Sequence, residues 1–525
     1  MSVKTVLKIC WKDHPDGPPE WWRYVIVFCN IFVTLFCIGL NYGMWILIEE
    51  LQVFFNDYHA AGRDEVDTKW IVYINIFMVG ITGPVASFSA NKYGHRITAF
   101  AGAALSTFGL FVSGFTKSIG FLCFSYGILT GIGYGLILVP SLGLLPRYFP
   151  RRYTITNAIC FIGIALSIFF FPPLFRGVHA RYGRRSVFFI LACLNAQLLV
   201  VTMLLRNKNQ TGNPSASTPL NSNAVAPANN DDGNESRFSR LVKGLDFALI
   251  HDSPPFCMIA ISMFFIGIGH NIVILHLVPH ARAMDYSETQ AQWFLTACGI
   301  FMIAGAITHG LLSIGLHFKA RVTMYGFSMA GVALVALLSS LPESFAGHFA
   351  LASLIGFLTG IYFPLIIVLI KHFIRDGWRL TAALGLALPL FGLGALIGLP
   401  VGDALNEGFD NYNSSYFFAG VALAISAFGV ILTPYLRDRQ RRMLHISDTA
   451  MEAEDEVDAA PPAAVYEVAD QSQMYEAVDN SSTADPGENP SNGQAGSSEK
   501  PSSGDNNGAL QEKSESEKVE DDTKF

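Results

Sequence analysis

Residues 146–161 read PRYFPRRYTITNAICF, and they place the basic residues Arg147, Arg151 and Arg152 between two apolar stretches, 119–145 and 154–175. Each stretch is long enough to cross a lipid bilayer as a helix, because a hydrocarbon layer of about 30 Å needs about 20 apolar helical residues. A basic turn between two such stretches is typical of a loop on the cytoplasmic face of a membrane protein.

The composition excludes a water-soluble globule of this size. Of the 525 residues, 51% are hydrophobic and 15% are charged, and the mean hydropathy is +0.37. The stretch after Leu444 carries about 20 acidic and about 4 basic side chains, so the body of the chain is basic and the tail is acidic. The eight cysteines show no CxxC spacing and no partnered histidines, so we expect neither a disulfide framework nor a metal site.

Twelve stretches of the chain are long and apolar enough to span a membrane. They are residues 24–48, 70–90, 97–116, 119–145, 154–175, 186–206, 255–279, 293–315, 322–341, 348–370, 380–401 and 415–435. Only a helix or a closed barrel satisfies its own backbone hydrogen bonds in lipid. The sequence therefore predicts an all-α membrane protein with twelve transmembrane helices.

A polar stretch rich in Ser, Asn, Pro and Ala separates the sixth predicted span from the seventh, and it cannot bury enough apolar surface to order itself. We therefore expect two six-helix bundles. The predicted parts are a cytoplasmic N-terminus (1–23), an N-terminal bundle (24–206), a disordered cytoplasmic linker (207–254), a C-terminal bundle (255–436) and an acidic, disordered cytoplasmic tail (437–525).

The basic residues of the short loops predict the orientation. With a cytoplasmic N-terminus, the inner segments hold about 18 Lys and Arg residues and the outer segments hold about 8. Half of the outer set comes from one hairpin, RGVHARYGRRS at 176–186, which breaks the rule. We expect both termini in the cytoplasm.

Glycines recur at helical spacing in the fourth and eleventh spans. They are Gly127, Gly131 and Gly135, and Gly394, Gly398 and Gly402. Small residues four apart let helix backbones approach closely, and tight packing alone is one reading of them. Their placement in both halves favours two bundles that rock about a site near the bilayer midplane.

The run YFPRRYTITNA resembles the loop after the fourth helix of the monocarboxylate transporter family, a branch of the major facilitator superfamily. Further stretches agree in order along residues 15–440. They include DGPPEWW, NYGMWILIEELQVFF, NKYGHR, LDFALIHDSPPF, HLVPHARAMDYSETQAQWFLTACG and IGLPVGDALNEGFDNYNSSYFFAG. The resemblance implies the major facilitator fold and transport of a small organic solute across the plasma membrane by alternating access.

The proton-coupled members of that family carry three charged residues where this chain has Ile46, Met302 and Ala306. The residues that usually couple transport to a proton are therefore absent, so symport with a proton would have to use other residues. With no fixed cation evident in the core, a small hydrated anion would bind poorly. A monocarboxylate of larger size, or a related amphipathic or zwitterionic metabolite, fits the sequence better.

Few ionisable side chains fall inside the predicted spans, and such residues are functional candidates. We expect the substrate or proton pathway to use His270, Asn271, His309, Asn41 and Tyr42. A cavity histidine could carry a proton, or could hydrogen-bond a neighbouring helix as a neutral structural group. His276 and His280 lie nearer the outer surface, where we expect them to be solvated or to take part in a gate.

We expect a cytoplasmic gate or family motif that consists of Arg151, Arg152, Asn157, Lys92 and Arg96. Arg151 and Arg152 could pair with anionic lipid headgroups or close the inner face against the second half.

Several partners follow from the chain. They are a small organic solute, a proton, the lipid bilayer, a single-span ancillary glycoprotein implied by some relatives, and a PDZ domain that would bind the C-terminal Phe525. We expect no nucleic acid partner and no cofactor. No nucleotide-binding loop or nucleophile with a base indicates an enzyme. The alternative reading is a sensor or scaffold that binds a solute on a transporter fold without moving it.

Overall fold

The structure is a computed structural model, and it describes residues 19, 21–45, 68–116, 118–150, 152–206, 249, 253–342, 344–374 and 379–443. All of these belong to one compact unit, residues 1–466. Most of the predicted linker and most of the predicted tail lie outside the described residues. Every regular element within the described ranges is a helix, as the length of the apolar stretches predicts.

The N-terminal half holds the helices from α2 to α11. Their bounds are α2 Trp22–Thr34, η1 Leu35–Gly39, α4 Trp70–Ile81, α5 Gly83–Tyr93, α6 His95–Ser113, α7 Ile119–Leu122, η2 Cys123–Thr130, α8 Gly131–Tyr148, α9 Tyr153–Tyr182, α10 Arg184–Asn195 and α11 Gln197–Met203. The first helix continues past η1 to Trp45.

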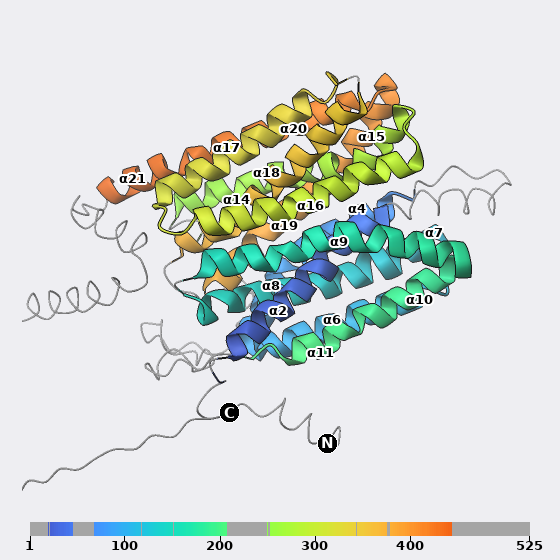
Figure 1. Cartoon of the computed structure of the whole chain (residues 1–525). Helices are drawn as coiled ribbons and strands as arrows, with labels where there is room; N and C mark the ends of the chain where they lie inside the picture. The colour runs from blue at the N-terminus through green and yellow to red at the C-terminus, as the bar shows by residue number, and fades with distance from the viewer. Residues whose placement is uncertain are drawn as a thin grey trace, which may run out of the picture. The chain divides into compact units, whose positions relative to one another are not determined.

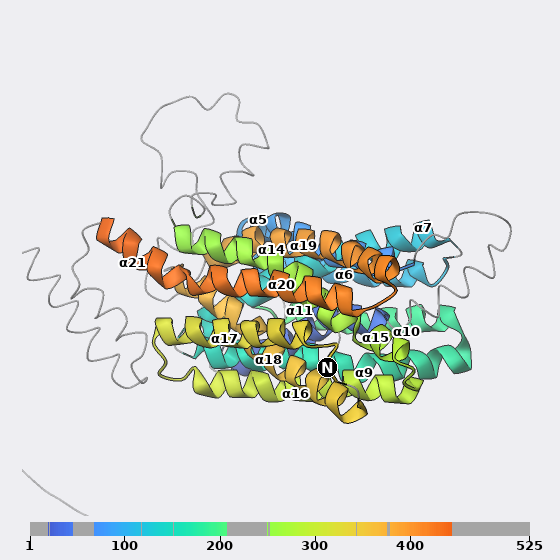
Figure 2. The ribbon, with the colours of Figure 1, turned by 90° about the horizontal axis from the view of Figure 1, so that it is seen from above.

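The C-terminal half holds the helices from α14 to α21. They are α14 Pro254–Leu275, α15 Leu277–Ala283, α16 Glu288–Leu312, α17 Phe318–Leu337, α18 Phe345–His372, α19 Arg379–Phe409, α20 Asn413–Ile431 and α21 Thr433–Met443. The two halves lie beside each other, one coloured blue to green and the other lime to orange (Figure 1). Figure 2 shows the long helices of both halves running along one common direction.

Eleven helices among the described residues are long and apolar enough to cross a membrane, and a twelfth span forms if α4 and α5 count as one bent by 42°. The prediction of an all-α membrane protein with two helical halves is confirmed. The predicted span 70–90 is one element in the sequence pattern, whereas the structure breaks it at Thr82 before Pro84, which has no N–H for a helical hydrogen bond.

Each half turns from its second to its third membrane helix through a left-handed glycine. Gly94 has a φ of 96° between α5 and α6, and Gly315 has a φ of 73° between α16 and α17. Residues with a Cβ rarely adopt this region, so glycine suits both turns. The repeated turn indicates that the two halves are built alike.

The halves meet along two seams. In one seam α4 and α5 pack against α19, and in the other α9 packs against α16. Gly80 on α4 faces Gly392 on α19 so closely that a Cβ built on Gly80 would lie 2.9 Å from the Cα of Gly392. Backbones approach this closely only where small residues meet.

Two helices extend beyond the apolar runs that predicted them. The eleventh predicted span ends at residue 401, but α19 continues to Phe409, and the fifth predicted span ends at residue 175, but α9 continues to Tyr182. Both extensions carry charged side chains, Asp403 and Arg176, that pair with residues of the other half. Because each charge is paired, a charged side chain can stand at these positions of a membrane helix in place of an apolar one.

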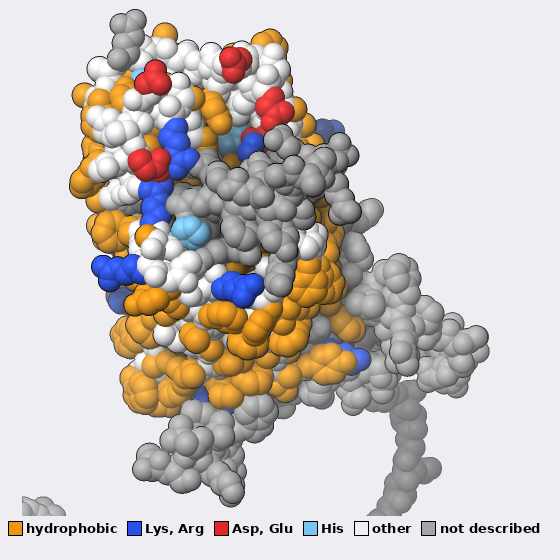
Figure 3. Space-filling view, turned by 90° about the vertical axis from the view of Figure 1, so that its right-hand side faces the viewer, with side chains coloured by type: hydrophobic (Ala, Val, Ile, Leu, Met, Phe, Trp, Pro, Cys, Tyr) orange, Lys and Arg blue, Asp and Glu red, His pale blue; other side chains and the backbone are white. Residues whose placement is uncertain are grey.

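We name the two ends of the bundle by residues that lie there. The Asp403 end carries Lys69, Asp403 and Glu288, and the opposite Pro150 end carries Pro150, His95 and Thr381. Figure 3 looks onto the Asp403 end, where Asp, Glu, Lys and Arg side chains gather over the C-terminal half and along its border with the N-terminal half.

Candidate functional site

A hydrogen-bonded chain of three side chains joins the two halves inside the bundle. His270 on α14 is buried, and its Nε2 lies 2.8 Å from the hydroxyl of Tyr42 in the N-terminal half. Its Nδ1 lies 2.7 Å from the hydroxyl of Tyr362 on α18. A neutral imidazole donates from one nitrogen and accepts at the other, so the two tyrosines take opposite roles. The hydrogen bonds of Tyr42, His270 and Tyr362 can therefore reverse their donor and acceptor roles when protons move along them.

Aromatic rings surround this chain. Phe363 stacks on His270 with 4.5 Å between the ring centroids and an interplanar angle of 17°. Phe161 of the N-terminal half meets Phe363 edge to face at 5.8 Å, and Phe391 meets it at 6.1 Å. Aromatic faces of this kind suit an apolar or cationic part of a solute.

The positions of the missing family charges are apolar where the structure describes them. Met302 and Ala306 on α16 are both buried. Ile46 lies outside the described residues. The described core around His270 therefore offers hydroxyls, an imidazole and aromatic rings rather than fixed charges.

The structure brings together two of the five residues predicted for the pathway, Tyr42 and His270. The other three have local partners. Asn41 accepts a hydrogen bond from the hydroxyl of Tyr126 at 3.2 Å, Asn271 donates to the carbonyl of Gly267 in its own helix at 2.8 Å, and His309 meets the hydroxyl of Ser313 at 3.1 Å. Tyr362 was expected from the sequence only as an aromatic side chain that could hold the solute, and it was not among these five, because a tyrosine in an apolar run gives no local signal of its contacts.

A second group, which we call the Asp403 cluster, holds the halves together at the Asp403 end. It consists of Asp403, His276, Lys69 and Tyr73. The Lys69 ammonium and the His276 Nε2 each lie 3.3 Å from Oδ1 of Asp403, and the Tyr73 hydroxyl donates to Oδ2. Trp45 stacks on both Tyr73 and His276, with centroid distances of 5.8 and 6.0 Å.

The Asp403 cluster draws on both halves of the protein. Lys69 precedes α4 and Tyr73 lies on it, whereas Asp403 lies on α19 and His276 joins α14 to α15. Sequence reasoning missed Asp403 because it placed the residue just beyond the end of the eleventh span. An acidic residue directly after Gly402, at the end of the glycine stripe, is the signal that could have found it.

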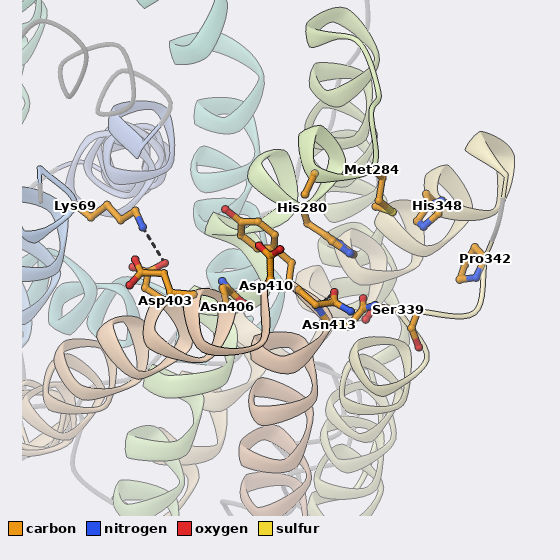
Figure 4. Close-up of a pocket in the computed structure, with 15 residues that line it drawn as sticks. Lys69, His280, Met284, Ser339, Pro342, His348, Asp403, Asn406, Asp410 and Asn413 are labelled. Carbon is orange, nitrogen blue, oxygen red and sulfur yellow. Dashed lines mark hydrogen bonds and ion pairs between the residues drawn. The ribbon is translucent and has the colours of Figure 1, made fainter. Parts of the chain in front are cut away.

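Beside this cluster lies a pocket of about 360 Å³. It opens between α15, the start of α18, the end of α19 and the residues before α20, and Figure 4 shows the Lys69–Asp403 ion pair at its edge. Its charged and titratable lining residues are Lys69, Asp403, Glu407, Asp410, His280, His348 and Tyr412. The lining therefore holds three carboxyl groups, on Asp403, Glu407 and Asp410, and one ammonium group, on Lys69.

Of the two expectations for His276 and His280, solvation is wrong, and a part in a gate stays a prediction. His276 is fully buried and His280 is 7% exposed, because α15 continues α14 and packs these rings against Tyr412 and Tyr416. Burial, helped by the neighbouring His348, lowers the pKa of His280 from 6.5 to about 4. His280 is therefore neutral at physiological pH. No group of three metal-ligating side chains occurs within the described ranges.

An additional contact across the halves lies at the Asp403 end. Arg176 on α9 donates to Oε1 of Glu288 at the start of α16, and Arg282 on α15 donates to both oxygens of the same carboxylate at 2.8 and 2.7 Å. Arg176 belongs to the hairpin that breaks the predicted charge rule. Its position is explained by this ion pair rather than by membrane orientation.

At the Pro150 end, hydrogen bonds join the two halves. Asn157 on α9 donates to the carbonyl of Pro364 on α18 at 2.8 Å, and Nε2 of His95 lies 3.3 Å from the hydroxyl of Thr381. The Lys371 ammonium donates to the carbonyl of Pro150 at 3.2 Å.

The other residues of the predicted gate are spread over the same end. Arg152 is exposed, Lys92 is exposed beside the rings of Phe88 and Tyr93, and Arg96 is half-buried on α6. Arg151 lies outside the described residues. Asn157, in contrast, contacts the other half through its hydrogen bond to Pro364.

The sequence model of the Major Facilitator Superfamily matches residues 27–280 and 257–454. Monocarboxylate transporter 13 of Bos taurus is 26% identical over 423 residues, which cover 80% of this chain and 90% of that protein. Monocarboxylate transporter 4 of Mus musculus is 25% identical over 454 residues, which cover 86% of this chain and 91% of that protein.

Solved structures share the fold. The transporter FucP in its outward conformation superposes with a TM-score of 0.56 and 13% identity, covering 79% of this chain and 99% of that one. The human organic anion transporter MFSD10 (TETRAN) gives a TM-score of 0.55 and 13% identity, covering 79% of this chain and 100% of that one.

Proposed function

Because the chain belongs to the Major Facilitator Superfamily and is a secondary solute transporter, we propose that it carries a small organic solute across the plasma membrane by alternating access. The two halves would rock about their seams, opening first one end of the bundle and then the other. The solute would bind where the halves meet, at the chain formed by Tyr42, His270 and Tyr362.

The single observation that supports this site best is the Tyr42–His270 hydrogen bond across the halves. A buried hydrogen bond between groups that must separate during rocking leaves both groups in need of a partner. A solute that offers a donor and an acceptor at this place replaces the bond. The site thereby favours a solute that bridges both halves.

The solute class follows from the lack of fixed charge around His270. A small, strongly hydrated anion would lose its hydration without gaining a cation, and this desolvation costs several kcal/mol. We therefore propose a monocarboxylate larger than lactate, or a related amphipathic or zwitterionic metabolite, with its apolar part against Phe363 and Phe391. The acidic lining of the pocket at the Asp403 end supports a solute with a positively charged group.

The orientation is part of the proposal. The excess of Lys and Arg in the predicted inner loops supports cytoplasmic termini, a cytoplasmic Pro150 end and an Asp403 end that faces outward. Asn157, Arg152, Arg151, Lys92 and Arg96 would then belong to the inner gate. Asn157 is the best supported of these, since it already bonds to the second half.

Two protein partners remain proposals. A single-span ancillary glycoprotein is supported by the family resemblance, and a PDZ domain is supported by the terminal residues DDTKF. Phe525 lies outside the described residues. Co-purification of the full chain and of a chain ending at residue 520 with a PDZ domain tests the second partner.

Radiolabelled uptake in a cell that lacks the protein tests the proposed function. Lactate, creatine and an aromatic amino acid would each be offered at about pH 6 and about pH 7.5 outside. We expect saturable uptake of the larger or zwitterionic solutes in excess of lactate. Saturable lactate uptake driven by an inward proton gradient would contradict the proposed solute class. If no solute moves through a folded, surface-expressed protein, transport itself is contradicted.

A further inference from the structure

Asp403 is the one carboxylate that is buried among the residues that the structure describes. Its exposed fraction is 8%, and it lies on a membrane-spanning helix near the Asp403 end. A buried carboxylate is costly in a membrane unless a cation or hydrogen-bond donors stabilise it. In transporters such residues commonly lie on the pathway of an ion or a proton.

The partners of Asp403 are divided between the two moving halves. Lys69 and Tyr73 belong to the N-terminal half, whereas His276 belongs to the same half as Asp403. If this end opens, Asp403 loses the ammonium and the phenol together and keeps the imidazole. The open state then holds a carboxylate next to a histidine with no cation from the other half.

We propose that Asp403, with His276 beside it, is a proton-binding site of this protein, and that binding the proton opens the Asp403 end. A proton from the solution at this end joins the Asp403–His276 pair and takes the place of the Lys69 ammonium. When the end closes, the returning Lys69 ammonium releases the same proton. The inference rests on the proposed function, because it needs two halves that separate.

Proton binding is linked to opening through a difference in affinity. In the closed state the Lys69 ammonium and the Tyr73 hydroxyl occupy the Asp403 carboxylate, so a proton would have to compete with both of them. The open state lacks both partners and binds the proton more tightly. A ligand shifts an equilibrium by its differential affinity for the two states, so acidification favours the open state. This site would give the chain a response to pH although Met302 and Ala306 lack the family's charges.

Other titratable groups face the cluster from the elements that pack around it. They are His280 and Arg282 on α15, Glu407 and Asp410 at the end of α19, Tyr412 before α20, and His348 on α18. Glu407 and Asp410 are exposed, so water stabilises both states of these carboxyls. Asp403, in contrast, is buried and has partners from both halves.

Two measurements on the purified full chain in lipid nanodiscs test the inference without any solute. Infrared difference spectra between about pH 7.5 and about pH 5.5 report protonation of a carboxyl group. Spin labels report the width of the Asp403 end. They would be placed by Ser118→Cys and Ala346→Cys in an otherwise cysteine-free chain, because both positions are exposed at this end, one in each half.

The wild type is expected to show a protonated carboxyl band at the lower pH and an open fraction that rises about tenfold, a coupling of ordinary size between two sites. Asp403→Asn should remove the band and make the open fraction independent of pH. Lys69→Gln should raise the open fraction at neutral pH. Since the Lys69 side chain is 30% exposed, this second variant is expected to fold even if Asp403→Asn does not.

Glu407→Gln is the matched control, because Glu407 lies one turn further along α19 but is exposed. It should keep both the band and the opening. An unchanged pH response in Asp403→Asn, or a wild-type open fraction that does not vary with pH, would overturn the proton site. If wild-type uptake is absent while both readouts behave as expected, the proposed solute transport fails and the proton site stands.

Discussion

Arg176 on α9 donates to the carboxylate of Glu288 at the start of α16, and this contact joins the two halves at the Asp403 end. Arg282 holds the same carboxylate from within the C-terminal half. The Asp403 cluster and this ion pair lie on different seams, one between α4 and α19 and the other between α9 and α16. Both seams are therefore held by ionic contacts at this end, whereas at the Pro150 end the halves are joined by the hydrogen bonds of Asn157, His95 and Lys371.

The Arg176–Glu288 contact predicts a contrast between two arginines. Arg176→Gln breaks the link between the halves, but Arg282→Gln leaves that link intact. We expect Arg176→Gln to raise the open fraction of the Asp403 end by up to about fivefold, since exposed ion pairs contribute less than about 1 kcal/mol. We expect Arg282→Gln to change it less. Spin-label distances across this end measure both, and an equal effect of the two variants would contradict the assignment.

The Tyr42–His270 bond predicts a loss of transport without a large loss of folding. Tyr42→Phe removes one buried hydrogen bond, which contributes about 0.5–1.5 kcal/mol. We expect uptake per folded molecule to fall about three- to tenfold. Tyr134→Phe is the control, because its hydroxyl donates to Asn195 within the N-terminal half at 3.0 Å. That variant should lose similar stability and keep its uptake. Equal uptake by the two variants would remove Tyr42 from the pathway.

The α4–α19 seam predicts that a larger residue at Gly80 destabilises the protein. A Cβ at this position would lie 2.7 Å from the carbonyl oxygen of Leu388, so Gly80→Val forces the helices apart. We expect a loss of about 1–3 kcal/mol in the free energy of unfolding, measured by thermal unfolding in detergent. Gly177→Ala is the control, since nothing lies within 4 Å of its Cβ position and alanine favours a helix by up to about 1 kcal/mol. Comparable losses in both variants would argue against close packing at this seam.

The burial of His280 predicts that this histidine does not set the pH dependence of uptake. Its pKa lies near 4 because of burial, so its charge does not change between about pH 7.5 and about pH 6. The stabilisation that comes from its neutral form is present above the ordinary pKa of 6.5 and is lost as the pH falls through 4. His280→Gln should leave the pH profile of uptake unchanged in the neutral range and reduce the acid sensitivity of folding. A shift of the uptake profile in this variant would show that His280 titrates near neutral pH.

The membrane helices could be predicted from the sequence because length and apolar composition are local properties. The runs at 119–145 and 154–175 appear in the structure as helices, and the all-α fold follows from them. The extension of α19 to Asp403 and of α9 to Arg176 could not be predicted in this way. Each depends on a partner more than 100 residues away in the chain, and a local pattern carries no information about that partner.

Only part of the candidate site could be predicted, because a local pattern shows a residue's type but not its distant partners. His270 stands out as an ionisable residue in an apolar run, and Tyr42 lies in a stretch that resembles the transporter family. Tyr362 and Asp403 join these residues only when the helices pack. The expectation that His276 is solvated failed because α15 continues the helix and buries the ring beside Trp45.

Solute counterflow in proteoliposomes tests most directly whether a solute passes between the halves at the Tyr42–His270–Tyr362 chain. Purified wild type and His270→Ala would be loaded with the solute that gives the highest cellular uptake, and exchange of the labelled solute would be followed. We expect saturable exchange by the wild type and a loss of at least about tenfold in the variant, because the bond across the halves and the solute's partner are both removed. Exchange that is equal in the two proteins, or absent from a folded wild type, would contradict this site.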